Sequence, residues 1–425
     1  MTRATFPDAV GQAHPQLLPE PVPRTDTDVQ EPPRPGRNFP AGDRLPWAAL
    51  LVMALTGFIL IATETMPAGL LPHIAAGLSV TEGTAGQFVS AYALGTVIAT
   101  LPAVALTRGM RRKPVFLVGI LGFLAATIVT ALSGDVVLSL GARFVAGAFS
   151  GLLWGMLAGY ARRITPAHLA GRALAVASIG TPLGLAVGTP LGSWLGTTLD
   201  WRWSFGALSI LAVATAVLAV ILIPNAPGQR AASRVPMIRV LRLPGVAVVL
   251  AVIVAWMMGH NVMYTYVSAY LRGIDVHLPV DVALVTFGVA ALVGIGITGA
   301  VIDRALRQLV FASLAVFATA GLIFMFGHQS LLAVLTAIVF WGVAFGGAAA
   351  QLQTAISAAG GENADVANSM LGVAFNLAIF AAGVAGAVVV GNVGGLALPV
   401  VMIGLVLTAL LIAALGCRTA FPTKI

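Results

Sequence analysis

The sequence predicts an all-α polytopic membrane protein with twelve transmembrane helices in two pseudo-symmetric six-helix bundles. Hydrophobic residues make up 59% of the 425 residues and charged residues only 9%, whereas roughly a quarter of the residues in a soluble domain are charged. The mean hydropathy is +0.97. Apolar runs long enough to cross ~30 Å of hydrocarbon, which takes about 20 residues, occur twelve times. A polar, basic stretch at 224–244 separates the first six runs from the last six.

Each predicted span is an apolar run that polar, charged, Gly or Pro residues bound on both sides. The chain contains 48 Gly, and small residues suit transmembrane helices because such helices associate by close backbone approach. The spans in order are 47–68, 84–106, 114–133, 136–160, 173–196, 203–223, 246–270, 282–302, 309–327, 331–353, 366–391 and 395–416.

The distribution of Lys and Arg predicts the orientation of the chain. Of 23 such residues, Arg143 lies inside a span, and only Arg202 and Arg272 fall in loops on one side. The other 20 lie in the two tails and in the loops of the opposite side. Because cytoplasmic loops carry the excess of Lys and Arg, we expect a multi-pass protein of the cell membrane with both termini cytoplasmic.

The same pattern predicts the domain organisation. Residues 1–45 are rich in Pro and mixed in charge, with no long apolar segment, so we expect a disordered cytoplasmic tail and no signal peptide. We then expect six-helix bundles at 46–223 and 245–416, a cytoplasmic central loop at 224–244 and a short cytoplasmic tail at 417–425.

Several classes of function are excluded at this stage. The basic residues are spread over short loops, which positive-inside topology explains without nucleic acid. The single Cys417 excludes an internal disulfide, and the six His have no metal-ligand spacing. No soluble segment is long enough for a catalytic domain, so we expect neither an enzyme nor a metal site.

Two basic loops at equivalent places indicate an internal duplication. After the second span, Thr107 precedes a basic cluster, and after the eighth span Asp303 begins a similar one. Duplicated halves are a common plan for transporters, whose substrate site lies near the midplane between them. The basic cluster residues with Asp303 are Arg108, Arg111, Arg112, Arg304 and Arg307.

At these loops the chain resembles the major facilitator superfamily. Residues 299–307 match its G-x-L-A-D-R-x-G-R signature, whereas the first copy has Thr107 in place of the usual Asp. The Arg residues of the first copy remain able to bind helix-end carbonyls. Arg143 with Gly147 is similar to the R-x-x-x-G signature of the fourth span, whose Arg is implicated in proton coupling.

The first and fifth spans resemble one branch of that superfamily, the twelve-span proton antiporters for drugs and sugars. The stretch from Thr63 to Ala75 is similar to T-E-F-x-x-x-G-L-L-P-x-I-A of its sugar-efflux and chloramphenicol-resistance subgroup. The fifth span carries two Gly-Thr-Pro-Leu-Gly blocks eight residues apart, and this spacing places both on one helix face. We expect a packing seam there, where the halves rock. Its signature residues are Gly184, Gly188, Pro190 and Gly192.

Glu64 and Arg143 are ionisable residues inside spans that are otherwise apolar. A charge in the bilayer is costly and usually serves a pathway or a proton relay. At 1.5 Å per residue, Glu64 lies about 25 Å along the first span and Arg143 about 10 Å into the fourth, which puts both in the outer part of the membrane. We predict proton coupling for this pair. The alternatives are an interfacial carboxylate that reaches water and an Arg that ties helices together.

Polar and aromatic residues in other spans are candidates for the substrate cavity. His260 interrupts the apolar run of the seventh span, and the resemblance places spans 1, 4, 7 and 10 around a central cavity. The alternative for such residues is a side chain satisfied by its neighbours or an aromatic ring facing lipid. The candidates are His260, Asn261, Tyr264, Asn376, Trp154 and Tyr92.

These observations together predict a proton-coupled exporter of small molecules, a drug or a sugar, that works by alternating access. The proton gradient is the expected energy source, with no cofactor. The expected partners are the substrate, protons and the lipid bilayer, and we expect a monomer. The alternative is an uncoupled facilitator or an uptake transporter of a small metabolite.

Overall fold

The protein is described here by a computed structural model that covers residues 1–2, 45–107, 109–228, 237–274 and 276–421. Residues 43–425 form one compact unit. Almost all of the predicted N-terminal tail, Arg108, most of the basic part of the central loop (229–236) and residues 422–425 lie outside the described residues.

All regular secondary structure in the described ranges is helical. The elements are α1 (Trp47–Thr65), α2 (Pro67–Leu78), α3 (Glu82–Thr107), α4 (Arg112–Leu132), α5 (Val136–Arg163), η1 (Ala167–Leu169), α6 (Ala170–Ser178), α7 (Gly180–Leu183), the π-helical turn η2 (Gly184–Gly188), α8 (Thr189–Thr198), α9 (Trp201–Leu222), α10 (Met237–Leu241), α11 (Val246–Thr265), α12 (Val267–Gly273), α13 (Val280–Phe326), α14 (Leu331–Gly346), α15 (Ala348–Gly360), η3 (Gly361–Asn363), α16 (Ala364–Asn392), η4 (Gly395–Ala397), α17 (Leu398–Leu415) and α18 (Cys417–Ala420).

The predicted membrane spans are present in this list. Eleven helical segments of the described chain are long and apolar enough to cross a membrane. The longest, α13, has 47 residues and contains one non-helical residue, Ala305, with φ −148° and ψ 43°. This break falls between the predicted spans 282–302 and 309–327, so α13 accounts for both. The prediction of an all-α polytopic membrane protein is confirmed, and its twelve spans fit these helices.

Two spans are broken near the same end of the molecule. The first span is divided at Met66, where Pro67 begins α2 and cannot donate a backbone hydrogen bond. The seventh is divided at Tyr266, whose φ of −109° and ψ of 24° separate α11 from α12 without a proline. Each break lets the end of a helix turn toward the middle of the molecule.

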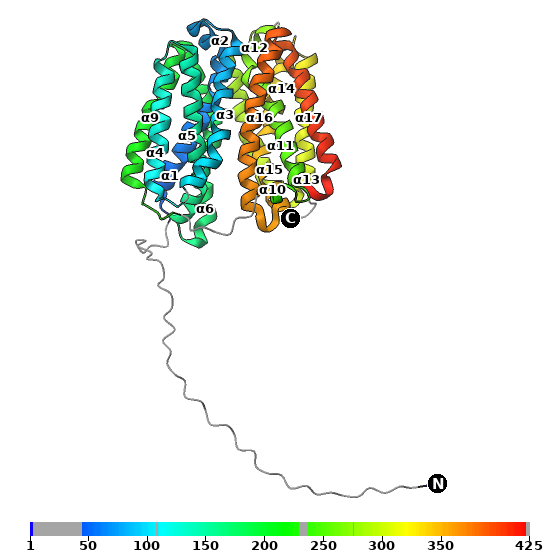
Figure 1. The fold of residues 1–425 in the computed structure, drawn as a ribbon. Coiled ribbons are helices and arrows are strands. Elements are labelled where there is room, and N and C mark those ends of the chain that lie inside the picture. Colours follow the sequence, from blue (N-terminus) through cyan, green and yellow to red (C-terminus); the bar gives the residue numbers. More distant parts are fainter. Residues whose placement is uncertain (3–44, 108, 229–236, 275, 422–425) are drawn as a thin grey trace. The chain divides into compact units, whose positions relative to one another are not determined.

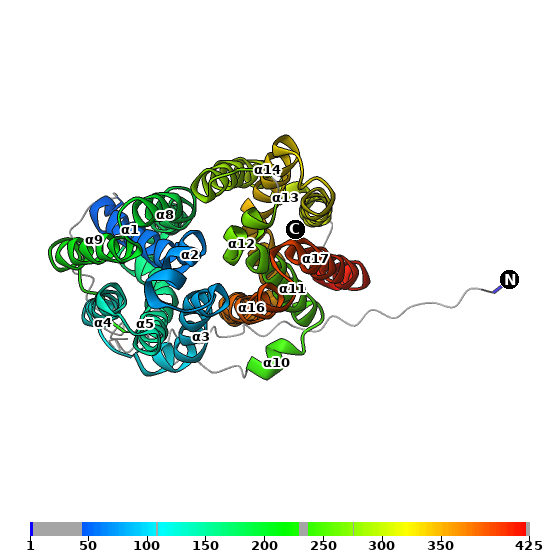
Figure 2. The same ribbon diagram turned by 90° about the horizontal axis from the view of Figure 1, so that it is seen from above.

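The helices up to α9, called the N-terminal half below, pack mainly on one another, as do those from α11 to α17, the C-terminal half. In the N-terminal half, α5 packs on α3 and α4, and α9 packs on α1 and α4. In the C-terminal half, α11 packs on α16 and α17, and α13 packs on α14 and α17. The halves meet where α3 contacts α16, where α13 contacts η2 and α8, and where α2 contacts α12 (Figure 1, Figure 2).

One end of the unit, called the basic end, carries most of the described loop Lys and Arg residues, and several of these bind helix-end carbonyls. The Lys113 ammonium donates to Val220 O, near the end of α9. In the second half, the Arg307 guanidinium donates to Cys417 O and Phe421 O, just after α17. Thus a basic residue at the start of the third helix of each half binds carbonyls at or just beyond the end of its sixth helix. These contacts complement the negative ends of the helix dipoles.

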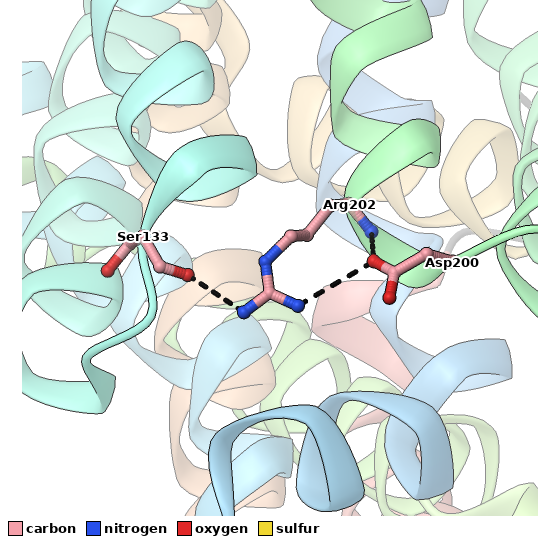
Figure 3. Close-up of polar contacts among 3 residues, drawn as sticks. All are labelled: Ser133, Asp200 and Arg202. Carbon is pink, nitrogen blue, oxygen red and sulfur yellow. Dashed lines mark hydrogen bonds and ion pairs between the residues drawn. The ribbon is translucent and has the colours of Figure 1, made fainter.

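At the opposite end lie the two loop arginines that depart from the one-sided distribution of basic residues, Arg202 and Arg272, and both pair with acids. Arg202 lies 3.7 Å from Asp200 and donates to Ser133 O at 3.1 Å, which joins the start of α9 to the end of α4 (Figure 3). Arg272 forms an ion pair with Glu82, and this pair joins α12 to α3. Each of these positive charges is therefore offset locally.

Candidate functional site

Glu64 is a nearly buried carboxylate in the last turn of α1. Its side chain is 6% exposed. The ion pairs of the described residues are Asp200–Arg202 and Glu82–Arg272, so Glu64 has no direct ion-pair partner among them. A buried carboxylate without a partner is costly in a membrane, and this is the arrangement expected of a group that exchanges a proton.

Arg143 on α5 lies inside the N-terminal half, where its side chain meets α3 and α9. It is 1% exposed, and its Nε donates to Phe88 O on α3 at 3.0 Å. Its guanidinium carbon lies 4.6 Å from the ring centre of Tyr92 and 5.6 Å from that of Phe205. The Nη2 atom is buried without an acceptor. Arg143 is thus held at one edge by a carbonyl and on its faces by aromatic rings, with one donor unused.

Tyr92 connects the surroundings of Glu64 and Arg143. Its ring lies against the Arg143 guanidinium, and its hydroxyl donates to Leu60 O at 3.2 Å. Leu60 precedes Glu64 by one turn of α1. Glu64 and Arg143 form no direct ion pair, and Tyr92 links their helices, α1 and α5. The structure therefore brings three of the predicted site residues, from α1, α3 and α5, into one cluster.

His260 occupies an aromatic cage in the C-terminal half. Its ring stacks on Phe345 with centres 3.4 Å apart, and its Nδ1 accepts a hydrogen bond from Trp341 Nε1 at 3.0 Å. Tyr264 and Phe287 complete the cage, with ring centres 5.1 and 5.6 Å from that of His260. Because Nδ1 is an acceptor here, the ring proton is on Nε2. The His260 side chain is 4% exposed, so in this conformation it is a packed group.

The remaining cavity candidates are dispersed. Asn261 donates to Met257 O and Asn376 to Gly372 O, each one turn back in its own helix. The Oδ1 atom of Asn376 is buried without a partner. Trp154 is half-buried, and its indole lies beside Gly57 of α1, on which a Cβ would be 3.6 Å from the ring. None of these three contacts the Glu64 cluster through a hydrogen bond among the described residues.

A polar junction joins the two halves next to Glu64. Thr65 and Thr189 share a hydrogen bond of 2.5 Å between their hydroxyl oxygens. The Tyr264 side chain of α11 lies close to both hydroxyls. Helices α1, α8 and α11 therefore meet at one point, where the residue after Glu64 lies close to the aromatic cage.

The glycine face of the fifth span packs on α1. A Cβ on Gly184 would lie 2.8 Å from Phe58 O, one on Gly188 2.9 Å from the Ala62 Cβ, and one on Gly192 2.8 Å from Met66 Cγ. The seam is therefore inside the N-terminal half, whereas the sequence suggested a seam where the halves rock.

The opposite face of this span meets the C-terminal half, since a Cβ on Gly288 of α13 would lie 2.9 Å from the Ala186 Cα.

The same span contains the π-helical turn η2. Pro190 follows it at the start of α8 and cannot donate a backbone hydrogen bond. The Thr189 N–H and hydroxyl both donate to Gly184 O, five residues back. Such turns are frequent at functional sites, and this one presents Thr189 to Tyr264.

Comparison with known proteins identifies the family. The model of the Major Facilitator Superfamily matches residues 53–387. The chain belongs to the major facilitator superfamily. It is 27% identical over 337 residues to a probable sugar efflux transporter of Haemophilus influenzae, which covers 78% of this chain and 84% of the relative.

Two further relatives are named as efflux pumps. The chain is 30% identical over 357 residues to a chloramphenicol efflux pump of Mycobacterium tuberculosis, which covers 79% of this chain and 84% of the relative. It is 28% identical over 374 residues to a purine ribonucleoside efflux pump of Salmonella paratyphi B, which covers 87% of this chain and 94% of the relative. This major facilitator superfamily protein is a membrane transporter and not an enzyme.

The superfamily signature loops take different structures in the two halves. In the first, Arg111 is exposed and occupies the N-cap position of α4 without a side-chain capping hydrogen bond. The Arg112 N–H donates to Ala226 O at 2.9 Å. Arg108 lies outside the described residues. In the second, Asp303 and Arg304 are exposed and form no ion pair with another described residue. Arg307 alone reaches the end of the last span.

Two functional candidates escaped the sequence analysis. Thr189 lies between the glycines of the fifth span, and Tyr266 follows a run of cavity candidates without any motif of its own. The nearby Pro190 is a signal for the altered turn at Thr189, since a proline inside a span frees a carbonyl. No group of three or more His, Cys, Asp or Glu side chains suited to a metal ion occurs among the described residues.

Proposed function

We propose that this transporter is a proton-coupled exporter of small molecules in the cell membrane, with its basic end and both termini in the cytoplasm. The observation that carries the proposal is Glu64, a carboxylate that is buried at membrane depth without an ion-pair partner and lies near the fixed charge of Arg143. The excess of Lys and Arg at the basic end supports the orientation.

The names of the relatives support export over uptake. They are named for the efflux of sugars, chloramphenicol and a purine ribonucleoside. We propose a substrate of the same kind, a small polar molecule without net charge. Glu64 then serves the proton and is not needed to neutralise a cationic substrate.

In the proposed cycle the halves alternate between two arrangements. The contacts among α2, α3, α12 and α16 close the end opposite the basic end, so this conformation corresponds to the state that opens to the cytoplasm. Protonation of Glu64 removes the negative charge that offsets Arg143. Release of the proton restores that charge, and the Glu64 carboxylate can then accept a hydrogen bond from the unused Arg143 Nη2. The proton and Arg143 thus compete for one carboxylate, and this competition couples the gradient to the conformation.

The proposal is tested with Glu64→Gln in proteoliposomes. Gln keeps the shape and most hydrogen bonding but cannot release a proton. We expect efflux driven by the proton gradient to fall to background, while substrate exchange without a gradient continues. Glu362→Gln, at an exposed acid of η3, is the matched control and should behave as the wild type.

The substrate is identified first by an efflux assay in an exporter-deficient host. The assay tests a panel of sugars, chloramphenicol and ribonucleosides, with and without a protonophore. Gradient-dependent efflux by Glu64→Gln at the wild-type rate would remove the proposed role of Glu64. Transport that no protonophore affects would instead identify an uncoupled facilitator.

A further inference from the structure

Tyr266 crosses from the C-terminal half to the N-terminal half at the end opposite the basic end. It lies at the break between α11 and α12 and is fully buried. Its hydroxyl donates to Gly383 O on α16 at 2.7 Å and lies 3.5 Å from Gly83 O on α3. This side chain at the α11–α12 break therefore contacts two further helices, of which α3 belongs to the other half.

Glycines on both sides form a slot for the Tyr266 ring. A Cβ on Gly86 of α3 or on Gly386 of α16 would overlap the ring of Tyr266. A Cβ on Gly383 would overlap the Ser90 hydroxyl, so α3 and α16 also approach each other directly there. The slot exists only while the two halves are in contact, because each half supplies one wall.

Two further side chains reinforce this contact. The Gln87 amide donates to Gly383 O at 3.2 Å and to Gly83 O at 3.3 Å. The Gly383 carbonyl thus accepts one side-chain donor from each half. The exposed ion pair of Arg272 and Glu82 lies just beyond, between α12 and α3. An exposed ion pair contributes little by itself, whereas the hydrogen bond of Tyr266 is shielded from water and is worth more.

At the equivalent position of the N-terminal half, the side chain cannot make such a hydrogen bond. Met66 lies at the corresponding break between α1 and α2, and it too is fully buried. Its side chain packs on Gly192 of the same half and has no hydroxyl. Each half therefore has a large side chain at its break, but only that of Tyr266 has a hydroxyl that reaches the other half.

We propose that Tyr266 and its slot of Gly83, Gly86, Gly383 and Gly386 form a latch that holds this end of the transporter closed. Opening requires the Tyr266 ring to leave the α3 wall of the slot, its hydroxyl to lose the contact with Gly83 O, and Gln87 to release Gly383 O. The hydrogen bond from Tyr266 to Gly383 O lies within the C-terminal half and is kept. The latch rests on the alternating access of the proposed function, since it needs a second state in which this end is open.

The test measures the distance between the halves at this end. Spin labels are attached at Leu199→Cys and Val393→Cys, which are 66% and 73% exposed, in a Cys417→Ser background. The labelled full-length protein is reconstituted in lipid nanodiscs, and distance distributions are recorded at several pH values. Tyr266→Phe keeps the ring and removes the hydroxyl. We expect the ratio of the long-distance to the short-distance population to rise roughly two- to threefold, because the hydroxyl contact that crosses between the halves, 3.5 Å from Gly83 O, is a weak hydrogen bond.

Tyr270→Phe is the matched control. The Tyr270 hydroxyl donates to a carbonyl of its own half, Phe324 O at 2.8 Å, as Tyr266 does to Gly383 O, but it forms no hydrogen bond with a described residue of the N-terminal half. We expect no shift for this variant. Gly386→Ala narrows the slot and leaves the hydroxyl in place, and it should also increase the long-distance population. Thermal unfolding in detergent checks that each variant is folded.

The outcomes separate the latch from the proposed function. If the wild type shows both populations but Tyr266→Phe and Gly386→Ala match Tyr270→Phe, the latch is overturned and alternating access stands. A single distance in the wild type at every pH, and with every transported solute, would overturn alternating access and the latch with it.

Discussion

The two halves repeat one architecture but differ in what they bury at the same depth. In the N-terminal half, Glu64 and Arg143 are buried charged residues, and Tyr92 contacts the Arg143 guanidinium and the backbone of α1 one turn before Glu64. In the C-terminal half, the corresponding interior holds His260 among four aromatic rings. A buried carboxylate changes its charge when it binds a proton, whereas the packing of aromatic rings depends mainly on the shapes of the side chains. If Glu64 carries the proton, as proposed, energy coupling lies in one half of this duplicated transporter and packing in the other.

The halves also differ in how their first and fifth helices pack. In the N-terminal half the glycines of η2 and α8 bring the backbone against α1. In the C-terminal half, side chains separate α11 from α16 and leave an apolar groove of about 300 Å³. Leu250, Val254, Met370 and Leu377 are among the residues that line it. The N-terminal pair is thus in close contact, and the C-terminal pair is looser.

The largest effect should follow from removal of the Arg143 charge. Arg143→Met keeps the length of the side chain and removes the positive charge that competes with the proton for Glu64, so gradient-driven transport should fall roughly 100-fold or more, as loss of the counter-charge of a buried carboxylate suggests. Arg143→Lys keeps a charge but loses the planar stacking on Tyr92 and the Nε hydrogen bond to Phe88 O, and we expect an intermediate rate.

Initial rates in proteoliposomes measure this prediction. Arg202→Met removes a charge that is paired with Asp200 at the surface, and it should leave transport within about twofold of the wild type, since exposed pairs contribute little. A gradient-driven rate for Arg143→Met equal to that of Arg202→Met would break the comparison between the halves.

A smaller effect, on stability and not on coupling, is expected from His260. His260→Ala empties the centre of the cage and leaves the Trp341 donor unpaired, which should lower the free energy of unfolding by roughly 3 kcal/mol. His260→Phe refills the cage and should cost about 1–3 kcal/mol through the unpaired donor alone. Denaturation in detergent measures both variants.

The same variants test whether the C-terminal half carries a proton. We expect the ratio of gradient-driven transport to exchange to stay at the wild-type value in His260→Phe. A collapse of that ratio would move the proton site to the aromatic cage and contradict the proposed division of roles.

Hydrophobicity predicts the spans of this protein because the bilayer imposes a length on every helix. It also predicts that Glu64 and Arg143 lie at one level, since depth follows from position in a helix. The partners of Arg143 could not be predicted, because Phe88 O and the Tyr92 ring depend on how α3 and α5 rotate against each other.

Residues brought together from distant helices were equally out of reach. The cage around His260 draws Phe287, Trp341 and Phe345 from α13 and α14, and no local pattern marks them. Pro67 signals the break in the first span, but nothing in the sequence marks the break at Tyr266. Local chemistry therefore predicts elements and depth, and contacts between elements need the fold.

The smallest effect should come from the glycine seam. In Gly188→Ala the new methyl group would lie 2.9 Å from the Ala62 Cβ and the Phe58 ring. The close contact of α1 and η2 must then loosen, and we expect a loss of about 1–2 kcal/mol in the free energy of unfolding, as for modest overpacking. Gly206→Ala in α9 is the control, because no atom lies within 4 Å of the added Cβ. The higher helix propensity of Ala should make that variant neutral or more stable by up to about 1 kcal/mol. Equal stability of the two variants would mean that the added methyl group meets no close contact between α1 and the fifth span, and the close packing assigned to the N-terminal half would be wrong.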